Sequence, residues 1–105
     1  NIEGFTGVEK LQGVRIKSTQ TQEEVELTCD GVFEYIGLKP STEAFAALGI
    51  LDEQGYIKVN SRMETSVAGI YGAGDVVTKE LRQVVTACSD GAVAAQVASK
   101  YIKTI

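Results

Sequence analysis

The chain has 105 residues, with ten Lys and Arg against fourteen Asp and Glu, and it contains neither His nor Trp. A net charge of −4 without a basic cluster excludes the electrostatic footprint of a nucleic-acid-binding protein, and the lack of His excludes His-based triads and most zinc, copper and haem ligand sets. Hydrophobic residues make up 44% of the chain, which is enough for a folded core, and the length by itself allows one small domain at most.

Targeting signals are missing from the sequence. No apolar run approaches the roughly 20 residues of a membrane helix, and no charged-then-apolar leader is present, so we expect a cytoplasmic protein without membrane contact. The chain opens with Asn1 and its single Met is Met63, so we expect a fragment of a longer protein. Cys29 and Cys88 lie far apart without a C-x-x-C motif, which favours two reduced, buried thiols and no metal site.

The first 37 residues carry the pattern of short strands. Residues 13–18 and 25–29 alternate apolar and polar side chains, and residues 32–36 follow as a more apolar run after a turn signal at Asp30-Gly31. Three strands in succession predict an antiparallel meander.

A short helix is predicted after the strands. Residues 37–40 interrupt the alternation and contain the only Pro of the chain. Ser41 or Thr42 is placed to cap a helix that runs to Leu48, and Gly49 is placed to end it.

The remaining sequence changes from turns to longer apolar segments. Residues 52–55 are predicted as a turn and residues 56–59 as a strand. Residues 67–73 are apolar without alternation, which is typical of a strand buried on both faces of a parallel sheet. Residues 82–101 place apolar and small side chains at three- and four-residue spacing, which predicts a long helix with a small-residue face.

The strongest candidate site follows the predicted strand 67–73. Asp75 would lie at the carboxyl end of that strand, where ligands bind in open α/β sheets, and its two oxygens suit a ribose or ribityl hydroxyl. Gly72 and Gly74 remove side chains where a ligand would approach the backbone. A plain Gly-Asp turn explains the pattern equally well, and a dinucleotide fingerprint is excluded because position 77 is Val77.

A second candidate feature opens the predicted long helix. Arg82 and Gln83 lie where helix N–H groups and partial positive charge suit carbonyl oxygens or negative charge on a ligand. An exposed Arg82 with Gln83 in an ordinary first-turn position is the alternative. With Asp75 a short loop away, the two features frame one crevice. The charges interpreted as solvated surface are Lys39, Lys79, Glu80, Lys100 and Lys103.

Six motifs follow one another along the chain, at residues 32–42, 55–57, 63–66, 69–75, 81–83 and 90–95. In this order and spacing they resemble the carboxyl-terminal third of bacterial low-molecular-weight thioredoxin reductases, flavoproteins of the pyridine nucleotide-disulfide oxidoreductase superfamily. The strand that ends in Gly-Asp is shared by the superfamily, whereas the Arg82-Gln83 pair is more particular to thioredoxin reductases and their close relatives.

The resemblance implies an α/β fold made of parts of two domains. Residues 1–37 would be the closing antiparallel β-meander of an NAD(P)H-binding domain, and residues 38–105 the strands and long helix of the carboxyl-terminal part of an FAD-binding domain. The hinge between the domains would include Gly37, Lys39 and Pro40. The implied cofactor-binding residues are Gly74, Asp75, Val76, Arg82, Gln83 and Val84.

The roles implied for these residues all concern FAD. Asp75 would bind the ribityl chain, the backbone at Val76 would approach the pyrophosphate, and residues 82–84 would face the pyrimidine edge of the flavin. Electrons would pass from NADPH through FAD to a cysteine pair that reduces thioredoxin, in a cytoplasmic homodimer.

The resemblance also implies that no catalytic residue lies in this segment. The two glycine fingerprints, the residues that choose between NADPH and NADH, and the redox C-x-x-C would precede residue 1, and Cys29 and Cys88 match none of the redox cysteines. The segment alone would be inactive. The alternatives are a thioredoxin-reductase-like ferredoxin-NADP reductase, the flavoprotein subunit of alkyl hydroperoxide reductase, and a non-enzymatic interaction module.

Overall fold

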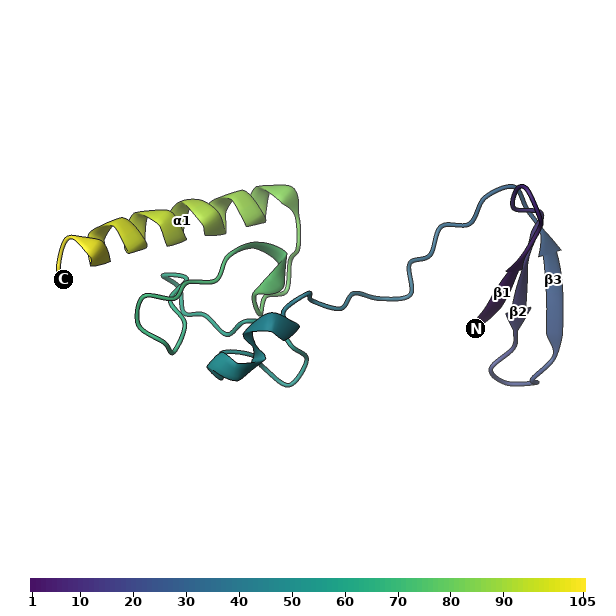
Figure 1. Cartoon of the computed structure of the whole chain (residues 1–105), viewed down its shortest axis with the longest axis horizontal. Coiled ribbons are helices and arrows are strands. Elements are labelled where there is room, and N and C mark those ends of the chain that lie inside the picture. Colours follow the sequence, from purple (N-terminus) through teal and green to yellow (C-terminus); the bar gives the residue numbers. More distant parts are fainter. The chain divides into compact units, whose positions relative to one another are not determined.

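The computed structural model describes residues 1–105, which form two compact units, Asn1–Gly37 and Leu38–Ile105. The first unit holds three strands, and the second holds two short 3₁₀-helices and one long α-helix (Figure 1). This small α/β organisation agrees with the fold class predicted from the sequence. No helix combines the length and the apolar character that crossing a membrane requires.

The first unit is a three-stranded antiparallel sheet in the order β1-β2-β3. Its strands are β1 (Ile2–Thr6), β2 (Gly13–Lys17) and β3 (Glu24–Thr28). Val14, which pairs with Phe5 on one side and Leu27 on the other, is only 8% exposed. The antiparallel meander and the strands expected at residues 13–18 and 25–29 are therefore confirmed, with bounds shifted by one residue.

The third predicted strand, residues 32–36, is wrong. This segment forms no strand, and its Phe33 and Tyr35 side chains are 90% and 91% exposed. The third strand is instead β1, which the sequence analysis did not predict and which pairs with β2. The physical reason is that an apolar, β-branched run becomes a strand only where a neighbouring edge accepts its hydrogen bonds, and residues 32–36 pair with neither edge of this sheet.

The second unit begins with η1 (Glu43–Leu48), which confirms the helix predicted here but has 3₁₀ geometry. Thr42 occupies the N-cap position, but its hydroxyl donates to the Gly55 carbonyl oxygen at 2.5 Å and does not cap the helix. Gly49 ends the helix in the left-handed conformation at φ 67°, a conformation that costs Gly least.

The predicted turn at residues 52–55 is present, and the Asp52 side chain holds it. Asp52 Oδ1 accepts the N–H groups of Gln54 and Tyr56, both at 2.9 Å, and the Gly55 N–H donates to the Asp52 carbonyl at 3.1 Å. These bonds form an Asx-type turn, which explains why an Asp lies at its first position.

The strands predicted at residues 56–59 and 67–73 are wrong, because the second unit contains only isolated bridges. These bridges join Leu51 to Ile57, Ile57 to Val77, and Glu64 to Tyr71. A strand buried in a parallel sheet requires a continuous ladder on each side, and each of these segments meets its partner at single residues. Residues 56–59 and 67–73 therefore do not form the regular strands of a parallel sheet.

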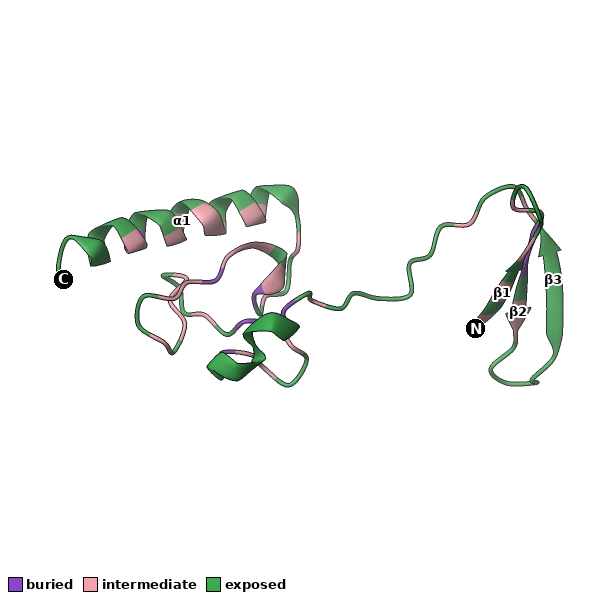
Figure 2. Cartoon of the chain, viewed as in Figure 1, coloured by how far each residue is buried: buried purple, intermediate pink, exposed green.

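The core of the second unit lies around Ile50, Ile57 and Val77, which are 2%, 7% and 2% exposed (Figure 2). Gly72 is packed against this core, because an added Cβ would lie 2.9 Å from Ile57 Cγ2 and 3.1 Å from Val77 Cγ1. The sequence-based interpretation that Gly72 makes room for a ligand is therefore wrong. Its missing side chain makes room for the core.

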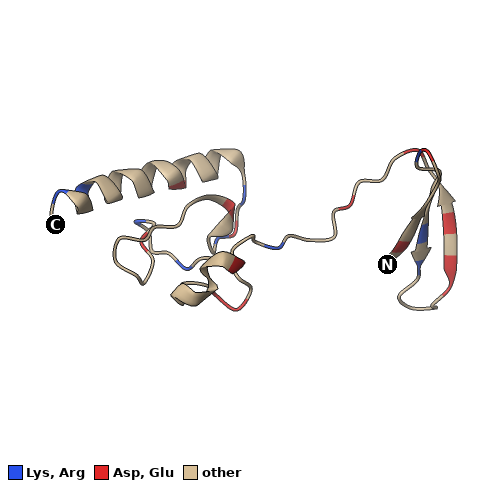
Figure 3. Cartoon of the chain, viewed as in Figure 1, with Lys and Arg blue, Asp and Glu red and all other residues tan.

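Helix α1 (Val84–Ile102) confirms the long helix predicted at residues 82–101, with its start two residues later. Asp90 and Lys100 are its only charged residues, and the rest of the helix is uncharged (Figure 3). Both cysteines are free, as predicted, but Cys88 on this helix is exposed and Cys29 is half-buried. The expectation that both thiols are buried is wrong, because Cys88 lies on a helix face that nothing in the second unit covers.

Candidate functional site

The candidate site is built on the single turn η2 (Gly74–Val76), which directly precedes the core residue Val77. The Ile57 N–H donates to the Val76 carbonyl at 2.8 Å, and the Thr78 N–H donates to the Ile57 carbonyl at 2.9 Å, so the turn is tied to the core through its backbone. Gly74 has φ +82°, which strains any residue with a Cβ. The Gly at this position is therefore required by the turn itself.

Asp75 projects from the middle of this turn. It is exposed, and its carboxylate accepts no hydrogen bond from the chain, while its backbone carbonyl accepts one. Both carboxylate oxygens are therefore available to an external donor. An ionised carboxylate offers acceptors only, so the group that it fits is one that presents hydroxyl or N–H donors, such as a polyol chain.

Arg82 braces the same turn from the loop before α1. Its Nε donates to the Asp75 carbonyl oxygen at 3.0 Å and its Nη2 to the Val77 carbonyl oxygen at 3.3 Å. The guanidinium carbon also lies 4.0 Å from the centroid of the Tyr56 ring, a cation–π contact. The structure thus brings Arg82 next to Asp75, as expected if the two residues frame one crevice. The guanidinium group, however, binds backbone carbonyl oxygens and not the Asp75 carboxylate.

Gln83 and Val84 lie at the start of α1, next to the turn. The Gln83 N–H donates to Thr86 Oγ1 at 3.1 Å, which caps one end of the helix backbone. Val84 is 81% exposed. The first turn of α1 contains no acidic side chain, so no side chain of the helix neutralises the partial positive charge at its N-terminus. A Cβ at Gly74 would lie 3.8 Å from Ala87 Cβ, which shows how close the helix approaches the turn.

The three residues predicted as a hinge lie at the boundary between the two units. Gly37 has φ +126° and is the last residue of the first unit. In the second unit, Lys39 Nζ pairs with Glu43 Oε1 at 2.9 Å, and Pro40 packs beside Gly55. The structure does not bring Lys39 or Pro40 into hydrogen-bond contact with the Gly74–Val76 turn.

Two residues that hold the turn were missed by the sequence analysis. Asp90 Oδ2 accepts the Gly74 N–H at 3.1 Å and the Lys79 Nζ at 2.5 Å. The Lys79 and Asp90 side chains are only 15% and 14% exposed, so the interpretation of Lys79 as solvated surface is wrong. The signal that could have found the pair is the position of Asp90, the single acidic residue within a helix otherwise rich in Ala and Val.

The hydroxyl of Thr78 links the turn after η2 to the turn at residues 52–55. It donates to Asp52 Oδ2 at 2.7 Å. This hydrogen bond is the largest of the effects that hold the pKa of Asp52 below its ordinary value; the backbone N–H groups of the 52–55 turn add to it, and partial desolvation opposes it.

We therefore expect Thr78→Val to raise the pKa of Asp52 toward its ordinary value, as followed by a carbon-13 NMR titration of the carboxyl group. A carboxyl whose pKa is lowered on folding stabilises the native state above its unfolded pKa, and this contribution is lost as the pH falls through the folded pKa. Thr78→Val should reduce that acid-side dependence, and Thr78→Ser, which keeps the hydroxyl, should preserve it. An unchanged Asp52 titration in Thr78→Val would contradict the assignment.

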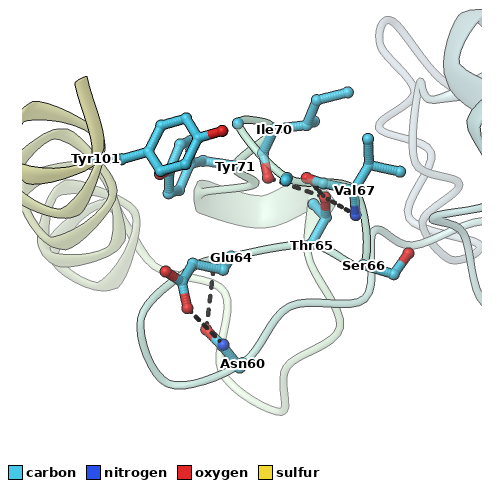
Figure 4. A pocket seen from close by; sticks show the side chains of 10 residues that line it. Asn60, Glu64, Thr65, Ser66, Val67, Ile70, Tyr71 and Tyr101 are labelled. Carbon is cyan, nitrogen blue, oxygen red and sulfur yellow. Dashed lines mark hydrogen bonds between the residues drawn. The ribbon is translucent and has the colours of Figure 1, made fainter. Parts of the chain in front are cut away.

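A separate pocket of about 300 Å³ lies between the 60–71 loop and the end of α1 (Figure 4). Two hydrogen bonds join polar groups of its lining: Asn60 Nδ2 donates to Glu64 Oε2 at 2.9 Å, and Thr65 Oγ1 donates to the Ile70 carbonyl oxygen at 2.9 Å. Tyr101 closes the pocket from α1 and lies over Gly69. None of the predicted site residues lines this pocket.

Comparison with known proteins relates the chain to one family. The family described as pyridine nucleotide-disulphide oxidoreductase matches residues 1–91. The chain is 49% identical over 96 residues to a thioredoxin reductase of Bacillus subtilis (strain 168), which covers 91% of this chain and 30% of that protein. It is 42% identical over 101 residues to the "34.2 kDa protein in rubredoxin operon" of Clostridium pasteurianum, which covers 96% of this chain and 33% of that protein.

Solved structures give the same relation. The crystal structure of Lactococcus lactis thioredoxin reductase in its FR conformation matches with a TM-score of 0.85 and 40% identity, over 100% of this chain and 35% of that one. The thioredoxin reductase of T. acidophilum matches with a TM-score of 0.78 and 42% identity, over 97% and 34%. This chain therefore spans about a third of the length of its relatives, and it belongs to the pyridine nucleotide-disulphide oxidoreductase family.

Proposed function

We propose that the chain is the carboxyl-terminal third of a low-molecular-weight thioredoxin reductase and supplies part of the flavin site. In this proposal, residues 1–37 close the NAD(P)H-binding domain and residues 38–105 complete the FAD-binding domain, with the hinge at Gly37, Lys39 and Pro40. The similarity to thioredoxin reductases over almost the whole chain supports the proposal.

The observation that carries the flavin assignment is the Asp75 carboxylate. It is exposed, it accepts no hydrogen bond from the chain, and it lies on a turn whose backbone is fixed by Arg82 and by the core residue Ile57. A carboxylate on a rigid turn can accept two hydroxyl hydrogen bonds without first losing internal partners. This is the chemistry that a ribityl chain requires of its site.

The start of α1 would take the other end of the flavin. Its first-turn N–H groups carry partial positive charge, Gln83 precedes them, and the exposed Val84 offers an apolar contact. When bound, FAD would accept a hydride from NADPH and pass the two electrons on to a disulfide. The residues of this chain would orient the flavin and stabilise negative charge on it, and the reacting cysteines would lie elsewhere in the protein.

The proposal is tested on the full-length product of the gene that encodes this chain. We expect it to bind FAD and to reduce thioredoxin with NADPH, measured by NADPH oxidation at 340 nm with insulin or a chromogenic disulfide as the final acceptor. Blocking its cysteines with iodoacetamide after reduction should abolish thioredoxin reduction and leave FAD bound.

Two outcomes would contradict this assignment. Reduction of ferredoxin that survives cysteine alkylation would identify a ferredoxin reductase of the same fold. A product that carries neither FAD nor NADPH oxidation activity would identify a non-enzymatic interaction module.

A further inference from the structure

The Lys79–Asp90 pair holds the Gly74–Val76 turn at its first residue and holds the chain shortly after the turn at Lys79. Asp90 Oδ2 accepts the Gly74 N–H, at the first residue of the turn, and the Lys79 Nζ, three residues after its last one. One carboxylate oxygen on α1 therefore closes the loop of chain that carries Asp75. The loop cannot shift relative to the helix without breaking at least one of these two bonds.

Both charges of the pair are largely removed from solvent. The Lys79 and Asp90 side chains are 15% and 14% exposed, whereas the other ion pairs of the chain have at least one partner that is 60% exposed or more. A desolvated carboxylate is costly unless it is paired and hydrogen-bonded, and here Lys79 supplies the charge and the Gly74 N–H supplies a second donor. Loss of either partner changes the environment of the other two groups.

We infer that Asp90 and Lys79 are positioning residues for ligand binding by Asp75. The inference rests on the proposed flavin site. Their hydrogen bonds go to the Gly74 backbone and to each other, and Asp75, one residue along, is left with a free carboxylate. The pair keeps the turn in the conformation in which Asp75 faces the ligand. Without it, the turn samples other conformations, and the apparent affinity falls in proportion to the fraction that remains competent.

The test uses the full-length protein, stripped of FAD, in the variants Asp90→Ala, Asp90→Asn and Lys79→Met. We expect Asp90→Ala to weaken FAD binding by roughly 10- to 100-fold, the range for loss of a hydrogen bond to a charged group. Asp90→Asn keeps an acceptor for the Gly74 N–H and should lose less. The matched control is Lys17→Met with Glu24→Ala, which removes a partly exposed ion pair in the first unit and should leave FAD affinity unchanged.

A second measurement separates positioning from simple stabilisation. Amide hydrogen exchange of the FAD-free protein should show faster exchange at Gly74 in Asp90→Ala, with exchange at residues 95–98 of α1, beyond the substituted turn, unchanged. The double variant Asp90→Ala with Lys79→Met should weaken FAD binding by less than the product of the two single effects, because both residues act through one turn.

The inference is overturned if folded Asp90→Ala protein binds FAD with unchanged affinity, or if its melting temperature falls while FAD affinity of the folded fraction and Gly74 exchange stay the same. If Asp90→Ala does not fold, Asp90→Asn and Lys79→Met decide in the same way. Failure of the flavin site itself is recognised separately: Asp75→Ala would then leave FAD binding unchanged, whatever the Asp90 variants do.

Discussion

Asp75→Ala in the full-length protein is expected to lower FAD affinity by roughly 10- to 100-fold, because the substitution removes the only side-chain acceptor on the Gly74–Val76 turn. The measurement is the dissociation constant of FAD for the stripped protein, followed by quenching of flavin fluorescence. Since the Asp75 side chain makes no hydrogen bond within the chain, its removal should leave the fold and the melting temperature of the FAD-free protein nearly unchanged.

Two further variants give this experiment its controls. Asp75→Asn keeps one acceptor oxygen and should lose less affinity than Asp75→Ala. Glu53→Ala removes another exposed carboxylate of the same unit, one that makes no hydrogen bond to the Gly74–Val76 turn, and should leave FAD affinity unchanged. If Asp75→Ala binds FAD as tightly as the unaltered protein, the ribityl assignment is wrong.

Ile57→Ala is expected to destabilise the second unit by about 2–5 kcal/mol, the range for truncation of a buried Ile. Ile57 is 7% exposed, and its side chain packs against Gly72 together with that of Val77, so its truncation leaves a cavity inside the core. The measurement is the free energy of opening from native-state hydrogen exchange of amides in residues 50–78 of the full-length protein.

Ile57→Val provides the matched comparison and should cost about 0.5–1.5 kcal/mol. Ala keeps the backbone bonds of residue 57 to Val76 and Thr78, but a loosened core should let this backbone and the turn move. Ile57→Ala should therefore also lower FAD affinity, whereas Ile57→Val should not. Equal stability of Ile57→Ala and the unaltered protein would show that the core does not lie around Ile57.

Local patterns in the sequence were sufficient for several elements. The alternation at residues 13–18 and 25–29 predicted β2 and β3, and the three- and four-residue spacing at residues 82–101 predicted α1. Asp52 and Gly49 predicted a turn and a helix end, because each acts through its own neighbouring backbone. The relation to thioredoxin reductases was also readable from the order and spacing of short motifs.

The pairing of strands was not determined by these local patterns. Residues 32–36 are apolar enough for a buried strand, yet it is β1 that pairs with the free edge of β2. Residues 67–73 form a single β-bridge, at Tyr71. A strand exists through hydrogen bonds to a distant segment, so its formation depends on which edge is within reach. The alternation of side chains indicates only that a segment is suited to such an edge.

The sequence by itself determined that the candidate site residues lie close together along the chain, from Gly74 to Val84. It also determined their individual chemistry, such as the carboxylate of Asp75 and the lack of a side chain at Gly74. Only the tertiary structure decided that Arg82 holds the carbonyls of Asp75 and Val77, and that Asp90 binds both the Gly74 N–H and the Lys79 side chain. The physical reason is that burial of a charge and the choice of its partner depend on contacts between segments, which no local pattern encodes.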